Sequence, residues 1–412
     1  MHPADSLRYM ERFVNDGSPS GFSKLYTTSA ETSPFGKTHG FHLYIAQGSA
    51  DHFRTWGSIP RWPVEPFADD DAWILVHPDM AADYSFAEVG ISLVRQDRYI
   101  VCPTASGRTV QFTNVQNEDY VKLHYVGILG RVDRRLPYKA TISGPEVSKI
   151  LTTACDQHVL NDWLAFLPEP GGRVLKIGSP ISEWGMTWRS CTPYGRRAPQ
   201  IAYLIPIFSL FSTDLYAPND SPLLRQLIEV SGVRPTVYIV EQMLAPMIRA
   251  YFSTICDLGL QPEWNAQNLF IATDHDFTLI AFVMRDLESV DKDITLRAHS
   301  GLSYSFESAP HKCIDNTQYN YRIKHSFMFD YKFGNYIIGP LLEFATSTYS
   351  ISYDILVSKI RDIVDDCLVR LPMDFFPEDD CWYEFEPVLI DQSQPWRPYV
   401  KHRNPPFRTV RR

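Results

Sequence analysis

The chain has 412 residues, of which 44% are hydrophobic and 21% charged, and its formal net charge is −9. These proportions are those of an ordinary folded protein, and the length allows two lobes that each bury a core. The net negative charge excludes a general nucleic-acid binder, which needs a clustered excess of Lys and Arg.

The spacing of the cysteines and the hydropathy of the chain exclude further classes of protein. The seven cysteines form no C-x-x-C pair, so the sequence predicts neither a zinc site nor a disulfide framework. The first residues carry charge where a signal peptide would have its apolar core, and no apolar run approaches the roughly 20 residues that span a bilayer. We therefore expect a protein of the reducing cytoplasm without a membrane anchor.

The first part of the chain, to about residue 122, predicts short strands. β-branched and aromatic runs are closed by turn residues in "HGFHLYIAQG", "AWILVHP", "DRYIVCP" and "RTVQFTNV". The pattern continues in "VKLHYVGIL", where Lys122 and His124 share one face. A helical pattern then begins near Pro145, and "IAYLIPIFSLF" is apolar enough to be buried in any conformation.

The second half predicts helices on either side of one hairpin. Apolar residues recur at helical spacing from Val237 to Ile255, with Thr236 as the expected N-cap, Gly259 as the stop and Pro246 as a kink. Another amphipathic helix is expected over residues 351–371. The final "KHRNPPFRTVRR" is basic and predicts a solvated tail, with a site for an anionic partner as the alternative.

The hairpin predicted by "LFIAT" and "FTLIAFVM" carries polar residues at its open end. Asn268 and Asp286 each lie nine residues from Phe277, so their side chains are expected to meet. Carboxamide and carboxylate oxygens suit Mg²⁺ held through nucleotide phosphates, as in protein kinases. The alternative is structural, with an Asn cap and an ion pair between Asp286 and Arg285.

A second candidate site is the turn in "PTASGRTV", which joins two predicted strands. An Arg side chain can donate to a phosphate in a bidentate fork, while hydroxyls and turn amides surround it. The polar residues of this turn and of the next segments are Ser106, Arg108, Thr109, Lys122 and Arg134. An exposed polar turn with no ligand is the alternative.

Taken in order, these motifs resemble the IucA/IucC family of siderophore synthetases that work without a nonribosomal template, including its FhuF-like C-terminal part. "YMERFVNDGSPSG" resembles the family's first motif, "WILVHPDM" its His-Pro-Trp-Gln strand and "PTASGRTV" its Ser-x-Arg-Thr phosphate loop. "VKLHYVGILGRVDRRL" resembles the family's Lys-Arg strand, and "WRSCTPYG" also fits. "PEWNAQNLFI" followed by "VMRDLESV" resembles its Glu-Ala-His-x-Gln-Asn and Arg-Asp signature.

The resemblance implies an α+β fold of two lobes with antiparallel sheets, a helical C-terminal lobe and an active cleft between the lobes. The lobes would span residues 1–213, with the phosphate loop, and 214–412, with the metal hairpin and basic tail. It also implies an enzyme that uses ATP and Mg²⁺ to adenylate a carboxylic acid and then passes the acyl group to an amine or hydroxyl. Its partners would be these small molecules, without nucleic acid or membrane, and a homodimer is compatible with the family.

Carried over by residue, the resemblance gives each candidate a role. Lys122 would face the phosphates, and Arg134 the acyl acceptor or the charge that develops at phosphorus. Asn268 and Asp286 would hold Mg²⁺, with Asn268 also near the nucleotide. The residues expected to contact the ATP phosphates from the loop are Ser106, Arg108 and Thr109; weaker candidates for substrate contact are His77 and Asn265.

Several positions depart from the family pattern. The early Gly-His-Pro-x-His-Pro segment is replaced at residues 17–22 by "GSPSGF", and neither Pro34 nor Lys37 recovers the histidines. Asn265 stands where the family has His, and Asp79-Met80 replaces Trp-Gln. The chain also begins close to the first motif, so we expect an N-terminally shortened member. Because Asn and Ser donate only as neutral groups, the acid is expected to be less charged than citrate or differently shaped.

Three functions are therefore open at the level of sequence. The first is the ATP-dependent ligase. The second is a repurposed enzyme that uses the fold for an ATP-independent cyclisation or condensation of an apolar intermediate, which the lost histidines and the 13% aromatic content favour. The third is a non-catalytic ligand-binding homologue. Retention of the loop, Lys122, Arg134, Asn268 and Asp286 favours the ligase.

Overall fold

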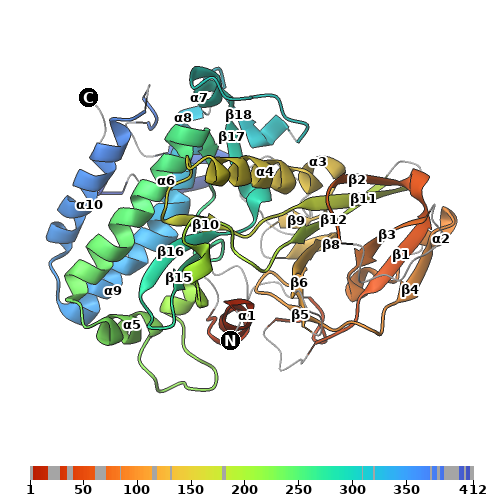
Figure 1. The fold of residues 1–412 in the computed structure, drawn as a ribbon, viewed down its shortest axis with the longest axis horizontal. Helices are drawn as coiled ribbons and strands as arrows, with labels where there is room; N and C mark the ends of the chain where they lie inside the picture. The colour runs from red at the N-terminus through yellow and green to blue at the C-terminus, as the bar shows by residue number, and fades with distance from the viewer. Residues whose placement is uncertain are drawn as a thin grey trace.

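The computed structural model describes residues 3–16, 28–34, 40–60, 71–83, 85–113, 118–129, 132–178, 182–308, 310–318, 321–371, 374–377, 381–384, 399–402 and 405–408. The departure expected at residues 17–22, and Lys37, lie outside these ranges. Figure 1 shows strands gathered on one side of the molecule and long helices on the other. The expected mixed fold of antiparallel sheets and helices is confirmed.

The β-rich side contains one large sheet, a smaller sheet and a two-stranded ribbon. The large sheet has the order β2 (Phe53–Gly57), β11 (Gly171–Ile177), β12 (Ser182–Arg189), β7 (Tyr120–Leu123), β6 (Thr109–Phe112) and β5 (Val101–Pro103). The smaller sheet has the order β3 (Asp71–Val76), β1 (Tyr44–Ser49) and β4 (Ser92–Arg95), and the ribbon pairs β8 (Tyr125–Leu129) with β9 (Val132–Arg134).

Three further sheets complete the described strands. A central four-stranded sheet has the order β10 (Leu164–Phe166), β16 (Leu279–Met284), β15 (Leu269–Thr273) and β13 (Tyr203–Pro206). The others are β14 (Leu260–Gln261), β17 (Asp291–Asp293) and β18 (Cys313–Ile314), and the pair β19 (Cys381–Glu384) and β20 (Tyr399–His402). The predicted hairpin is confirmed, because β15 and β16 pair antiparallel.

The α-helices in the first half are α1 (Pro3–Phe13), α2 (Ser85–Glu88), α3 (Tyr138–Thr141) and α4 (Ser143–Asp156). Those in the second half are α5 (Leu223–Ser231), α6 (Ala245–Leu258), α7 (Ile294–His299), α8 (Tyr321–Ser326), α9 (Gly339–Tyr349) and α10 (Tyr353–Leu368). Two π-helical stretches, η5 (Val237–Leu244) and η8 (Phe327–Ile338), lead directly into α6 and α9. No described helix combines the length and apolarity needed to cross a bilayer.

The predicted long helix starts differently from the prediction, and the kink expected at Pro246 stays a prediction. Thr236 has helical dihedral angles and makes no capping hydrogen bond, so the expected N-cap was wrong. A proline ring crowds the carbonyl of the preceding turn. Here the turn before Pro246 is widened, with the Ala245 amide donating to the Val240 carbonyl five residues back. Gly259 ends α6 at φ 57°, as predicted.

The basic tail is not simply solvated. Phe407 and Arg408 are buried, and Arg408 Nε donates to Asp330 Oδ1 at 2.7 Å in an ion pair whose two side chains are both 0% exposed. Burial of the Asp330 carboxyl raises its pKa to about 6 in spite of Arg408. The tail prediction was therefore wrong for residues 407–408, because a buried acid on η8 needs the guanidinium.

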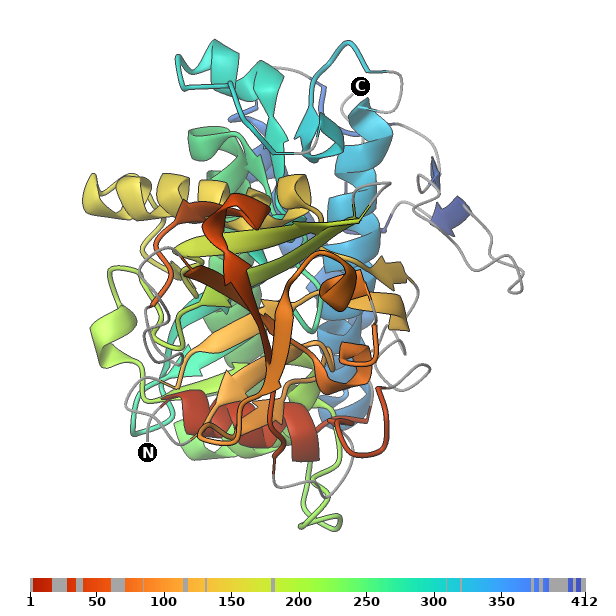
Figure 2. The same cartoon turned by 90° about the vertical axis from the view of Figure 1, so that its right-hand side faces the viewer.

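Helix α1 lies where the central sheet and the large sheet approach each other (Figures 1 and 2). Its Ala4 and Leu7 share one buried cluster with Tyr120 of β7 and with Phe270 and Val283 of the central hairpin. Ser6 Oγ accepts a hydrogen bond from the Leu204 amide at 3.0 Å. The helix thus joins the two sheets from below. The lobe boundary near residue 213, the cleft and a homodimer stay predictions.

Candidate functional site

The predicted phosphate turn joins β5 to β6, and its polar atoms are ordered by local hydrogen bonds. The Gly107 amide donates to the Thr104 carbonyl at 3.0 Å, and Gly107 has φ 73°, which a glycine adopts without strain. Ser106 Oγ accepts from the Thr109 amide at 3.1 Å and lies 3.3 Å from the Thr104 hydroxyl. The turn therefore holds its hydroxyls in fixed positions.

Arg108 is a buried cation without a carboxylate in direct contact. Its side chain belongs to a residue that is only 6% exposed, and its Nη1 donates to the backbone carbonyl of Arg134. Burial, and then the charge of Arg134, lower the pKa of Arg108 to about 10. A buried guanidinium that has only a neutral acceptor beside another guanidinium is suited to bind an anion.

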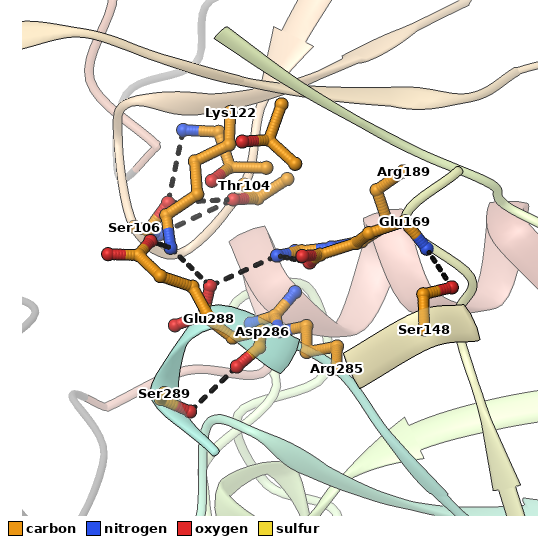
Figure 3. A network of polar contacts seen from close by, with 12 residues as sticks. Thr104, Ser106, Lys122, Ser148, Glu169, Arg189, Arg285, Asp286, Glu288 and Ser289 are labelled. Atoms are coloured by element: carbon orange, nitrogen blue, oxygen red, sulfur yellow. Dashed lines mark hydrogen bonds and ion pairs between the residues drawn. The ribbon is translucent and has the colours of Figure 1, made fainter. Parts of the chain in front are cut away.

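Lys122 lies next to this turn on the sheet, because Lys122 of β7 pairs with Thr109 of β6. Its ammonium contacts two carboxylates that follow the central hairpin: it donates to Asp286 Oδ1, and to Glu288 Oε2 at 2.6 Å (Figure 3). Burial disfavours the charged form of Asp286, but Lys122 and then Arg189 outweigh it and hold the Asp286 pKa well below its usual range. The positive charge of Lys122 is therefore already balanced by carboxylates of the protein itself.

A second cation on β12 connects to the same carboxylate. Arg189 donates from Nε and Nη2 to Glu169 Oε1 at 2.9 and 2.7 Å, and from Nη2 to Asp286 Oδ1 at 3.1 Å (Figure 3). Glu169 is fully buried; burial raises its pKa, and Arg189 offsets only part of that effect. The site thus combines four cations, Arg108, Lys122, Arg134 and Arg189, with three carboxylates.

The hairpin register differs by one residue from the prediction. Leu269 pairs with Met284, and the Arg285 amide donates to the Asn268 carbonyl at 3.0 Å, so Arg285 rather than Asp286 lies opposite Asn268. The turn is centred on Asp276, because Thr273 pairs with Leu279, and not on Phe277 as the prediction assumed. An extra residue at Ile280 then recovers one of the two residues of difference. Asp286 adopts φ 63° and ψ 55°, outside the strand, and its carboxylate turns toward Lys122.

The structural alternative for Asp286 was wrong as well. Arg285 forms its ion pair with Glu11 of α1, at 2.5 Å between Nη1 and Oε1, and not with Asp286. Arg285 Nε also donates to the Gln267 carbonyl at 3.1 Å. Asn268 is buried, 9% exposed, and the expectation that it shares a cation with Asp286 stays a prediction.

The two weaker candidates have structural contacts. Asn265 Oδ1 accepts from the amides of Gln267 and Asn268 at 2.9 and 3.0 Å, which fixes the turn into β15. His77 is 0% exposed between the rings of Phe41 and Tyr125, and burial lowers its pKa to about 4. A direct substrate contact for Asn265 or His77 stays a prediction.

Sequence reasoning missed several members of the site. Arg189 lies in the quoted "WRSC" segment, and a lone Arg after the apolar strand "GMTW" is the signal that could have singled it out. Glu288 follows Asp286 by two residues, but nothing in "RDLES" shows that both carboxylates face one lysine.

The described residues offer two neighbouring carboxylates as possible metal ligands. Within them, no group of three or more His, Cys, Asp or Glu side chains is placed to hold an ion. Asp286 and Glu288 do present oxygens to one shared cation, the Lys122 ammonium. Mg²⁺ is commonly held by one or two carboxylates together with substrate phosphates. The two carboxylates therefore fit a nucleotide-bound Mg²⁺ but not a metal site made by protein alone.

Comparison with known proteins identifies the fold. No protein-family model and no curated protein matches the chain. Among solved structures, the ATP-bound aerobactin synthetase IucA of Klebsiella pneumoniae matches with a TM-score of 0.69 at 13% identity, over 98% of this chain and 79% of that one. IucC of the same organism matches with 0.66 at 15% identity, over 98% and 80%.

A third similar structure is the petrobactin biosynthesis protein AsbB of Bacillus anthracis, with a TM-score of 0.66 at 13% identity, over 89% of this chain and 68% of that one. At these identities the likeness establishes the fold and leaves the reaction open. The resemblance inferred from ordered motifs is thus confirmed at the level of structure: the chain has the fold of the siderophore synthetases.

Proposed function

We propose that the protein is an ATP-dependent ligase that adenylates a carboxylic acid and transfers the acyl group to an amine or hydroxyl, as in siderophore-like biosynthesis. The observation that carries the proposal is the environment of Arg108. This guanidinium is buried on a hydroxyl-bearing turn, beside Arg134, and its hydrogen-bond acceptor is a neutral carbonyl. A triphosphate would supply the negative charge that the turn lacks.

The residues have separate tasks in this reaction. Arg108, with the Ser106 and Thr109 groups of the turn, would bind phosphate oxygens. Lys122 and Arg189 lie on the adjacent strands and would stabilise negative charge as it grows at phosphorus. The protein supplies position and charge, since the described site contains cations, hydroxyls and carboxylates around the reacting groups.

The proposed chemistry balances in two steps. A carboxylate oxygen of the acid attacks the α-phosphorus of ATP, and the bond to the bridging oxygen breaks, so pyrophosphate leaves with the electron pair. An amine or hydroxyl then attacks the acyl carbon, AMP leaves and the nucleophile loses its proton. Asp286 and Glu288 would hold Mg²⁺, which neutralises part of the phosphate charge when bound. The ammonium of Lys122 must then part from at least one of these carboxylates.

The test is to incubate the protein with Mg²⁺-ATP, a panel of carboxylic acids and hydroxylamine, and to measure pyrophosphate and hydroxamates. Turnover is expected with at least one acid and is expected to disappear in Arg108→Ala. Arg95→Ala is the matched control, because Arg95 is an exposed arginine on β4 paired with Asp97. If no acid supports turnover and ATP does not raise the melting temperature, the ligase proposal fails.

A further inference from the structure

Beneath the site, a buried carboxylate on α1 pairs with the residue that directly precedes Asp286. Glu11 is 0% exposed and forms an ion pair with Arg285, the residue directly before Asp286. Tyr120, two residues before Lys122 on β7, lies within the electrostatic reach of both Glu11 and Arg285. In a strand, residues two apart share a face, so Tyr120 and Lys122 point to the same side.

Polar atoms around Glu11 lack hydrogen bonds to any described group. They belong to three residues: the Glu11 oxygen outside the ion pair (Oε2), the Tyr120 hydroxyl and Arg285 Nη2. Because buried polar atoms are rarely left unsatisfied, ordered water is expected among them. The arrangement is a polar junction held by one ion pair rather than apolar packing.

Asp286 directly follows the arginine that this junction holds. Its left-handed backbone is unusual for a residue with a side chain, and such conformations persist only where neighbours hold them. Arg285 is fixed on three sides: its amide bonds to Asn268, its Nε to Gln267 and its Nη1 to Glu11. Without the charge of Glu11, the Arg285 guanidinium would be buried without a counter-ion, one residue away from the Asp286 carboxylate.

We propose that Glu11 is a positioning residue for the site: by holding Arg285 it keeps that guanidinium away from Asp286, so that Asp286 stays available to Lys122 and to a metal-bound nucleotide. The inference rests on the proposed function for its kinetic consequence only. The arrangement of Lys122 and Asp286 can be measured without ATP.

The experiment compares Glu11→Gln with Glu118→Gln. Glu118 also pairs with α1, through Arg8 at 2.9 Å, but that pair is partly exposed and does not touch Arg285. The first readout is the rate at which an amine-reactive reagent labels Lys122 in the ligand-free protein. Mass spectrometry measures this rate. We expect faster labelling of Lys122 in Glu11→Gln, because Asp286 turns toward Arg285, and wild-type labelling in Glu118→Gln.

The second readout is steady-state kinetics with Mg²⁺-ATP. We expect Glu11→Gln to lower kcat/KM for ATP by about 10- to 100-fold, the range seen when a residue supporting a metal ligand is removed. The double variant Glu11→Gln with Arg285→Gln removes both charges and should recover part of this loss, which a merely structural role would not produce.

Unchanged Lys122 labelling in a folded Glu11→Gln protein would overturn the proposal. If Glu11→Gln does not fold, Glu11→Asp replaces it: the shorter carboxylate should give intermediate labelling, and wild-type labelling there would count equally against the inference. If the wild-type protein shows no turnover at all, the ligase proposal fails, while the labelling result still decides the role of Glu11.

Discussion

Arg108, in the turn before β6, and Lys122, on the adjacent strand β7, are both buried cations, but their surroundings differ. Arg108 donates to a backbone carbonyl and lies beside another guanidinium, whereas Lys122 contacts two carboxylates. The first therefore gains by meeting an anion, and the second is already neutralised and must give up a partner. Under the proposed function, the turn would bind phosphate, and Lys122 would exchange partners when the substrate binds.

The largest expected effect comes from removing the cation that lacks a carboxylate. Arg108→Met should lower kcat/KM for ATP by about 100-fold or more, the loss typical of a group that stabilises transition-state charge. Its unfolding free energy should not fall, because the variant removes a buried charge without orphaning an opposite one. Kinetics and urea denaturation check both parts. A large loss of stability would contradict the comparison.

Arg408 gives a reference for a cation with a purely structural partner. Arg408→Met should lower the free energy of unfolding by about 3 kcal/mol, because it leaves the buried Asp330 without a counter-ion. ATP-dependent kinetics of the folded fraction should match the wild type. Adding Asp330→Asn should recover part of the stability, and no recovery would mean that packing, and not charge, explains the loss.

Lys122 should fall between these two cases. Lys122→Met is expected to cost about 2 kcal/mol of unfolding free energy, since Asp286 and Glu288 then repel each other, and also to weaken ATP-dependent turnover. We discount the cost because Asp286 and Glu288 keep 27% and 22% of their side chains exposed. Chemical denaturation checks the loss, which Mg²⁺ alone should leave unchanged if the ion binds only together with nucleotide.

The smallest effect concerns His124, which lies two residues beyond Lys122 and stacks on Trp184. Burial, and then Arg108, lower the pKa of His124 to about 3. A pKa below the unfolded value of about 6.5 means that stability is present above pH 6.5 and is lost as the pH falls. Between the two pKa values, His124 should lower the free energy of unfolding by about 1.4 kcal/mol for each pH unit that the pH falls. His124→Gln should remove this contribution to the pH dependence of the unfolding free energy, measured by denaturation from pH 7 to 5.

Local patterns allowed much of the fold to be predicted. The strands around the phosphate turn, α4, α10, the central hairpin and the Gly259 stop follow from alternation, helical spacing and turn chemistry, which act between near neighbours. The burial of Arg408 depends on Asp330, a partner distant in sequence, and leaves no local signal.

The same division applies to the site. Sequence motifs located the turn with Arg108 and placed Lys122 beside it. They could not show that Asp286 faces Lys122 and Arg189, because the position of the turn, a bulge in β16 and a left-handed residue set that direction. Glu169 and Glu11 could not be predicted for another reason: the role of a buried acid becomes clear only from the arginine that it contacts in the folded structure.

The position of α1 also has a consequence for how the protein is made. Residues 3–13 leave the ribosome long before Arg285, yet Glu11 lacks this counter-ion until Arg285 has been synthesised and β16 has joined its sheet. Contacts between such distant segments form late, because a long loop must close before they contribute. The polar site should therefore be among the last parts to assemble, and refolding should yield compact chains before it yields competent ones.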